Sequence, residues 1–206
     1  MIIRSFLGGL LTPFFILVFI FVGNIPLNKK FKTDIRTNII RPALEAIGEW
    51  SPEAEELIYG TGQQESRYKH RRQLIKNKEG KLVPRGRARG YFQMEPATFR
   101  DHVDWMMGRG HYQGERPRTK YLEGIRKLNG GKDPTLDDVQ LNDKVAAAMA
   151  RIHYKRRPGA IPKDTLGQAQ YWKKHYNTYL GAGTVDEYMK NYRKLMEANG
   201  NGGQKV

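Results

Sequence analysis

An uncharged, apolar run near the amino terminus constrains this chain more than any other feature. No charged residue occurs from Ser5 to Asn28, and residues 6–22 are almost wholly apolar. A helix that crosses the hydrocarbon core of a bilayer needs roughly 20 mostly apolar residues, and this run is long enough. A cleaved signal peptide and a buried core helix are the alternatives, but the run is longer than a usual signal segment and lacks a clear cleavage site. The sequence therefore predicts a single transmembrane helix over 1–27 that anchors the protein to a membrane.

The length, cysteine content and net charge of the sequence limit what the rest of the chain can be. At 206 residues it has room for one ordinary domain and an appendage. It contains no cysteine, which excludes disulfides and thiolate metal sites. Its formal net charge of +15 favours polyanionic partners, namely nucleic acid, anionic lipid or an acidic cell wall. Charge alone does not choose among these three.

Changes in composition divide the chain into four parts. After the anchor at 1–27 we expect a basic juxtamembrane linker with some amphipathic helix at 28–50, packed on lipid or on its own domain. The globular domain is expected at 51–195, and a frayed tail at 196–206. Its first helix should begin at Ser51, where Ser caps, Pro52 takes the first helical position and Glu53 suits the positive end of the helix dipole.

Within the domain, periodicity and capping signals predict a mainly α fold with one small hairpin. The first helix should run towards Tyr68, weakened by Gly60 and Gly62. A turn between Leu74-Ile75 and Leu82-Val83 predicts the hairpin. We expect further helices over 96–107, around 145–155, over 165–179 and from 184 towards 197, and mostly loop over 111–132 with one helical turn around Leu122.

Three short segments stand out for their chemistry. The first is Gln63-Gln64-Glu65-Ser66-Arg67-Tyr68. The second is Gly90-Tyr91-Phe92-Gln93-Met94-Glu95-Pro96-Ala97-Thr98. The third is Tyr176-Asn177-Thr178, followed by Gly181-Ala182-Gly183-Thr184. A carboxylic acid at a helix end, a Gly-aromatic-Gln turn and a late Tyr-Asn pair, in that order, indicate a cleft that cleaves sugar chains.

This ordered set resembles the lysozyme-like superfamily, and most closely the soluble lytic transglycosylases carried by tailed phages. The resemblance covers about residues 51–192 and is more specific for the set than for any one segment. It implies an α+β lysozyme-like domain that cleaves the β-1,4 bond between N-acetylmuramic acid and N-acetylglucosamine in peptidoglycan. It also implies that Glu65 is the single catalytic acid, which protonates the glycosidic oxygen and then acts as base on the 6-hydroxyl of the sugar. The product would carry a 1,6-anhydro ring.

The resemblance names further candidates around this acid. We expect Ser66, Gly90, Tyr91, Gln93, Tyr176 and Asn177 to contact substrate. An acid that must be protonated near neutral pH needs an apolar pocket to raise its pKa, and Leu57, Ile58, Tyr91, Phe92 and Tyr176 are available to build one. Outside this context, a Glu at a helix end would more often be a solvated ion-pair partner.

The acidic residues of this sequence differ in two ways from the usual glycosidase pattern, and both bear on the mechanism. Most glycosidases use two carboxylates, and the only acid between Glu65 and Gly90 is Glu79, in the expected hairpin. Glu95 is the candidate for a second carboxylate and would favour a lysozyme-type hydrolase. The five histidines show no ligand spacing with nearby acids, so we predict no metal and no cofactor.

Location and partners follow as expectations. The cations after the anchor, Lys29, Lys30, Lys32 and Arg36, outnumber Arg4 before it, which would keep the domain on the cytoplasmic side. A wall-cleaving enzyme must reach the far side, and delivery by a virus particle would remove the conflict. We therefore expect a virion component or a protein of the wall-facing host envelope, with peptidoglycan, the membrane and other virion proteins as partners.

Two other functions stay open. A structural membrane or DNA-conduit protein would keep the domain without its activity. The basic stretch 69–89 would suit DNA or an anionic wall, or would simply be a solvated face. Aromatic residues occur only at its margins, at Tyr68 and Tyr91, which gives DNA binding weak support.

Overall fold

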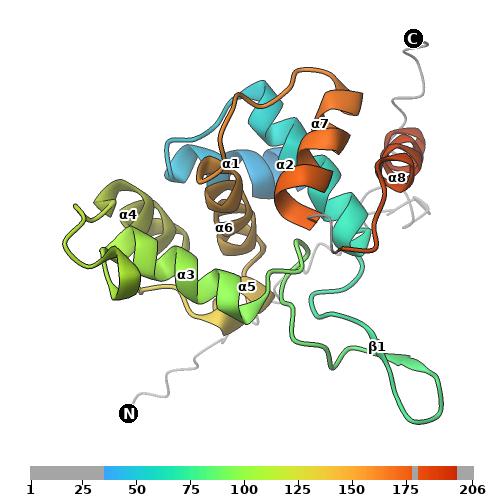
Figure 1. The fold of residues 1–206 in the computed structure, drawn as a ribbon, viewed down its shortest axis with the longest axis horizontal. Helices are drawn as coiled ribbons and strands as arrows, with labels where there is room; N and C mark the ends of the chain where they lie inside the picture. The colour runs from blue at the N-terminus through green and yellow to red at the C-terminus, as the bar shows by residue number, and fades with distance from the viewer. Residues whose placement is uncertain (1–34, 178–180, 199–206) are drawn as a thin grey trace, which may run out of the picture. The chain divides into compact units, whose positions relative to one another are not determined.

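The computed structural model describes residues 35–177 and 181–198 (Figure 1). The expected transmembrane helix, the first residues of the expected linker and the tail from residue 199 lie outside these ranges. Among the described residues, no helix has the length and apolar character needed to cross a bilayer.

The described chain is mainly helical, with one two-stranded antiparallel ribbon. In chain order the elements are η1 (Arg36–Ile40), α1 (Arg41–Ala46), α2 (Pro52–Ser66), β1 (Ile75–Lys76), β2 (Leu82–Val83), α3 (Pro96–Met107), η2 (Gly110–Tyr112), α4 (Thr119–Leu128), α5 (Leu136–Leu141), α6 (Asp143–Lys155), α7 (Thr165–Trp172), η3 (Lys173–Asn177) and α8 (Val185–Ala198).

Helix α6 is the centre of the core. Every residue from Val145 to Tyr154 is buried, so this helix is covered on all sides. Helices α1 to α5 all contact it, and Figure 1 shows it among them. The helix starts at Asn142, whose side chain accepts from the backbone N–H groups of Lys144 and Val145.

The segment before Ser51 corrects the expected domain boundary. Ile40, Ala43, Leu44 and Ile47 are fully buried, and η1 and α1 pack against α6. Residues 35–50 are therefore part of the folded body and not a linker, because their apolar residues fill the core. Ser51 begins a helix within the domain, not the domain itself.

Helix α2 begins as expected and is packed more closely than expected. The Ser51 hydroxyl accepts from the N–H of Ala54, and Pro52 opens the helix. A Cβ added at Gly60 would lie 1.9 Å from the Tyr188 hydroxyl, and one at Gly62 would lie 2.5 Å from the Tyr68 ring. The two glycines cost helix propensity, but they allow α8 and the chain after α2 to approach the helix.

The expected hairpin is present, with Ile75 paired to Val83 and Lys76 to Leu82. Figure 1 shows it extending away from the helices, below the end of α2. The expectation of mostly loop over 111–132 was wrong, because residues 119–128 form the ten-residue helix α4, which buries Tyr121, Leu122 and Ile125. The short helix α5 was not expected either.

Candidate functional site

Glu65 lies in the last turn of α2, and the residue as a whole is partly buried. Its Oε1 accepts a hydrogen bond of 2.9 Å from the indole Nε1 of Trp172, at the end of α7. Burial disfavours the carboxylate and raises the pKa of Glu65 from 4.5 to about 7, although the Trp172 bond acts in the opposite direction. Near neutral pH this acid is therefore protonated in a large fraction of molecules.

Tyr176 connects all three sequence segments. Its hydroxyl donates a 2.6 Å hydrogen bond to the backbone carbonyl of Phe92, in the second segment. Burial raises the pKa of Tyr176 well above its ordinary value, and the charge of Glu65, in the first segment, raises it further. The fold thus brings Glu65, the Phe92 backbone and Tyr176 into one place.

The rest of the third segment forms one edge of this site. A Cβ added at Gly183 would lie 2.7 Å from the Trp172 ring, so only glycine allows this loop to rest on that indole. Lys173 Nζ donates to Asn177 Oδ1 at 2.9 Å and to the Gly181 carbonyl at 2.8 Å. The Asn177 side chain therefore helps to hold the loop against Trp172.

The second segment is a tight loop whose predicted contacts serve the protein itself. Gly90 has φ +71°, and a Cβ there would lie 2.5 Å from the Val139 carbonyl of α5. Gln93 Nε2 donates a 2.7 Å bond to the Gly90 carbonyl. Gly90 and Gln93 thus shape the loop that offers the Phe92 carbonyl to Tyr176.

The two remaining candidates also have protein contacts. The buried Ser66 hydroxyl accepts from the Tyr68 N–H at 3.1 Å and donates to the Gly62 carbonyl at 3.2 Å, which closes the end of α2. Tyr91 is half-buried between the edge of Tyr68 and the guanidinium of Arg71. For Ser66 the structure supports a positioning role, while Tyr91 keeps part of its surface exposed beside the site.

Strained backbone occurs in the first two segments. In the described ranges, the non-glycine residues with positive φ are Arg67 and Tyr68, both at +53°, and Gln93, at +48°. Each costs on the order of 1 kcal/mol relative to ordinary backbone. All belong to the first two segments. Such strain persists where the surrounding structure enforces it, and it is typical of functional sites.

Among the described residues, no second carboxylate contacts Glu65. The pKa shift of Glu65 arises from burial and from Trp172, neither of which is an acid. Glu95 is exposed at the start of α3, and its side chain makes no capping bond there. The part of the chain that the structure describes also contains no cluster of His, Cys, Asp and Glu suited to a metal ion.

Sequence reasoning missed two parts of the site. Trp172 lies one helical turn before Tyr176, and this i, i+4 spacing would have placed both rings on one face. The second part is a buried pair of histidines beneath Tyr176. His102 Nε2 lies 3.0 Å from His153 Nδ1, and the ring of His153 packs against Tyr176 with centroids 4.8 Å apart.

The hydrogen bonds of this pair fix its protons. His153 Nε2 lies 2.8 Å from the His175 carbonyl, which only accepts, so Nε2 carries the hydrogen and Nδ1 accepts. His102 Nε2 must then donate, and its Nδ1 accepts from the Arg156 guanidinium, which also binds Asp101. Both rings are therefore neutral. Burial lowers the pKa of His153 to about 4 and that of His102 well below its ordinary value.

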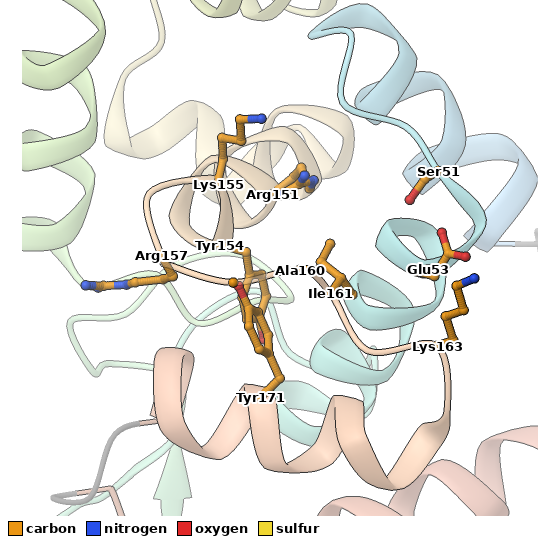
Figure 2. Close-up of a pocket in the computed structure, with 11 residues that line it drawn as sticks. Ser51, Glu53, Arg151, Tyr154, Lys155, Arg157, Ala160, Ile161, Lys163 and Tyr171 are labelled. Atoms are coloured by element: carbon orange, nitrogen blue, oxygen red, sulfur yellow. The ribbon is translucent and has the colours of Figure 1, made fainter.

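A separate cavity of about 440 Å³ lies at the other end of α2 (Figure 2). It is bounded by Ser51 and Glu53 at the start of α2, by the end of α6 with the loop after it, and by Tyr171 of α7. Glu65 does not line it. Twelve residues along a helix correspond to roughly 18 Å, which separates Glu53 from Glu65.

Comparison with protein-family models, with curated protein sequences and with solved structures found no match.

Proposed function

We propose that this protein is a peptidoglycan lytic transglycosylase of the lysozyme-like type, with Glu65 as its catalytic residue. The observation that carries the proposal is the state of Glu65, an acid at a helix end with a pKa of about 7, held by Trp172 and placed beside Tyr176. A general acid works best when its pKa lies near the working pH. The resemblance of the three segments supplies the substrate class.

In the proposed reaction, protonated Glu65 gives its proton to the glycosidic oxygen after N-acetylmuramic acid. The bond from C1 to that oxygen breaks, and the N-acetylglucosamine side leaves as an alcohol. The carboxylate then takes the proton of the 6-hydroxyl of the muramic acid while O6 bonds to C1. Glu65 returns to its protonated form, and the product carries a 1,6-anhydro ring. The sugar supplies its own nucleophile, so one carboxylate is sufficient.

The surroundings of Glu65 suit both halves of this cycle. Burial raises the pKa so that a large fraction of the resting carboxyl is protonated near neutral pH, and the Trp172 N–H stabilises the carboxylate that forms after proton transfer. The Phe92 carbonyl receives the Tyr176 hydroxyl and fixes that ring beside the acid. The exposed position of Glu95 gives the hydrolase alternative no support.

We further propose that residues 1–27 anchor the enzyme to a membrane, and that it opens the bacterial wall locally during phage entry or release. This places it in the virion or in the wall-facing host envelope.

A zymogram of the full-length protein on peptidoglycan tests the catalytic claim. We expect wild type to clear the wall and Glu65→Gln to lose at least about a thousandfold in rate, because the amide cannot donate the required proton. Glu95→Gln is the matched control and should retain activity. If Glu65→Gln clears as well as wild type, the catalytic proposal fails, and loss of activity in Glu95→Gln would instead indicate a two-carboxylate hydrolase.

A further inference from the structure

The hairpin between Glu65 and Gly90 carries charge that the rest of the fold does not neutralise. Residues 69–89 contain nine Lys or Arg and one acid. Arg71 binds Asp143 through two hydrogen bonds, and Arg72 and Arg89 donate to the Gly86 carbonyl. The other six cations are exposed and form no ion pair with an acid of the described residues. They are Lys69, Lys76, Lys78, Lys81, Arg85 and Arg87.

These cations are displayed on an ordered arm. The Lys81 N–H donates to Asn77 Oδ1 at 2.8 Å, and the Asn77 N–H donates to the Lys81 carbonyl at 2.9 Å, which closes the turn. Nearer the body, Gln73 Oε1 accepts from the Arg87 N–H at 3.0 Å, while the Gly86 N–H donates to the Gln73 carbonyl. Like charges held together in this way repel one another, so the arm favours a polyanion.

The base of the arm is joined to the candidate site. The arm begins at Tyr68, two residues after the end of α2, and returns at Gly90. Arg72 and Arg89 form a β-bridge where the two sides meet. The Gln93 side chain reaches back to the His70 carbonyl at 3.4 Å. A polymer bound along the arm would therefore be held next to Glu65.

The register of the hairpin argues against a lipid partner. Ile75 and Leu82 are exposed, and both are aliphatic. Neighbouring residues of a strand point to opposite faces, and Ile75 pairs with Val83 while Lys76 pairs with Leu82. The two exposed aliphatic side chains thus lie on opposite faces and form no single apolar surface. No Phe, Tyr or Trp lies between Tyr68 and Tyr91 to stack on single-stranded bases.

We propose that this hairpin is a docking arm for the acidic peptidoglycan strand. Its exposed cations bind the carboxylates of the peptide stems and hold the glycan on Glu65. The inference rests on the proposed function, since it takes the wall strand as the substrate of that site. It makes the substrate class more specific, namely wall strands that keep their free carboxylates.

Binding to purified sacculi tests the arm. The parent protein is the full chain in detergent with Glu65→Gln, which prevents digestion. It is compared with the same protein that also carries Lys76→Gln, Lys78→Gln and Lys81→Gln, here called the hairpin triple. The control triple is Lys127, Lys132 and Lys144→Gln, which removes the same charge from other exposed positions. At low salt we expect binding about tenfold weaker for the hairpin triple and near the parent value for the control. Equal binding by the two triples overturns the proposal.

Two further binding experiments identify the partner. Sacculi whose carboxylates have been converted to amides should bind the parent protein as weakly as untreated sacculi bind the hairpin triple. Duplex DNA and anionic lipid in mixed micelles with the same detergent are tested in parallel, and a tenfold loss by the hairpin triple on either of these, with unchanged binding to sacculi, also overturns the proposal.

Kinetics separate this inference from the proposed function. With Glu65 intact, the hairpin triple should raise KM on sacculi about tenfold and leave kcat unchanged, because the arm acts in docking. If wild type releases no product, the proposed function fails. The binding experiment does not depend on product release, so it still tests whether the hairpin binds sacculi. If product forms and the hairpin triple has the KM of wild type, only the docking arm fails.

Discussion

At the scale of single residues, Glu65 is partly exposed, yet burial disfavours the charged form of its carboxyl. This burial raises the pKa of Glu65 to about 7. The folded protein holds this proton between pH 4.5 and 7, while the unfolded chain releases it. The free energy of unfolding therefore decreases as pH rises through this range, and the full loss of stability is present above pH 7. A residue that destabilises its own fold in this way is typical of a functional site.

Glu65→Gln should consequently stabilise the protein at alkaline pH. The glutamine keeps an oxygen for the Trp172 N–H and carries no charge. We expect thermal denaturation at pH 8 to show a gain of up to ~3 kcal/mol in the free energy of unfolding, from 1.36 kcal/mol per pKa unit. At pH 4.5 wild-type Glu65 is neutral, and the gain should nearly vanish. Equal gains at both pH values would contradict a raised pKa.

Trp172→Phe tests the partner of the acid. The Trp172 hydrogen bond lowers the pKa of Glu65, so its loss should raise that pKa above its present value. A general acid loses activity as pH rises through its pKa, which places the alkaline limb of wild-type kcat/KM near pH 7. In Trp172→Phe this limb should move to higher pH. A limb that stays in place or moves lower would show that the indole does not set this pKa.

At the scale of elements, local signals predicted much of the fold. Ser51 and Pro52 start α2, and the Thr184 and Glu187 capping box precedes α8. Contacts distant in sequence were not predictable. The burial of Ile40 and Leu44 under α6, and the fit of Gly90 against Val139, depend on tertiary packing that no local pattern contains. The same holds for the hydrogen bond that joins Trp172 to Glu65 across 107 residues.

Gly60→Ala tests the close packing of α2 and α8. In an open helix this change stabilises by about 1 kcal/mol, because Gly is a poor helix former. Here the new Cβ would lie 1.9 Å from the Tyr188 hydroxyl, so we expect a loss of about 1–3 kcal/mol from overpacking. Thermal denaturation at pH 7 measures it. A higher melting temperature than wild type would show that α8 does not approach α2 as described.

At the scale of the whole molecule, the buried histidine pair links stability to pH. The unfolded chain takes up protons near pH 6.5, whereas the folded pKa of His153 is about 4. Unfolding therefore becomes easier as pH falls from 6.5 to 4, and above 6.5 the pair contributes no pH dependence. The ring of His153 supports Tyr176, so acid should loosen the candidate site with the core.

His153→Gln checks this linkage, since an amide offers one donor and one acceptor without taking up a proton. Denaturant titrations from pH 7 to pH 4 should show a shallower loss of stability in the variant than in wild type. His70→Gln, at an exposed position, should follow the wild-type curve. An unchanged slope in His153→Gln would contradict a neutral, buried pair.

In the proposed reaction the sugar supplies its own nucleophile and Glu65 acts alone. Analysis of the muropeptides that the full-length enzyme releases from sacculi tests it most directly. We expect 1,6-anhydro ends, each lighter by one water than the hydrolysed product, and their absence with Glu65→Gln. Release of reducing ends by wild type would contradict it.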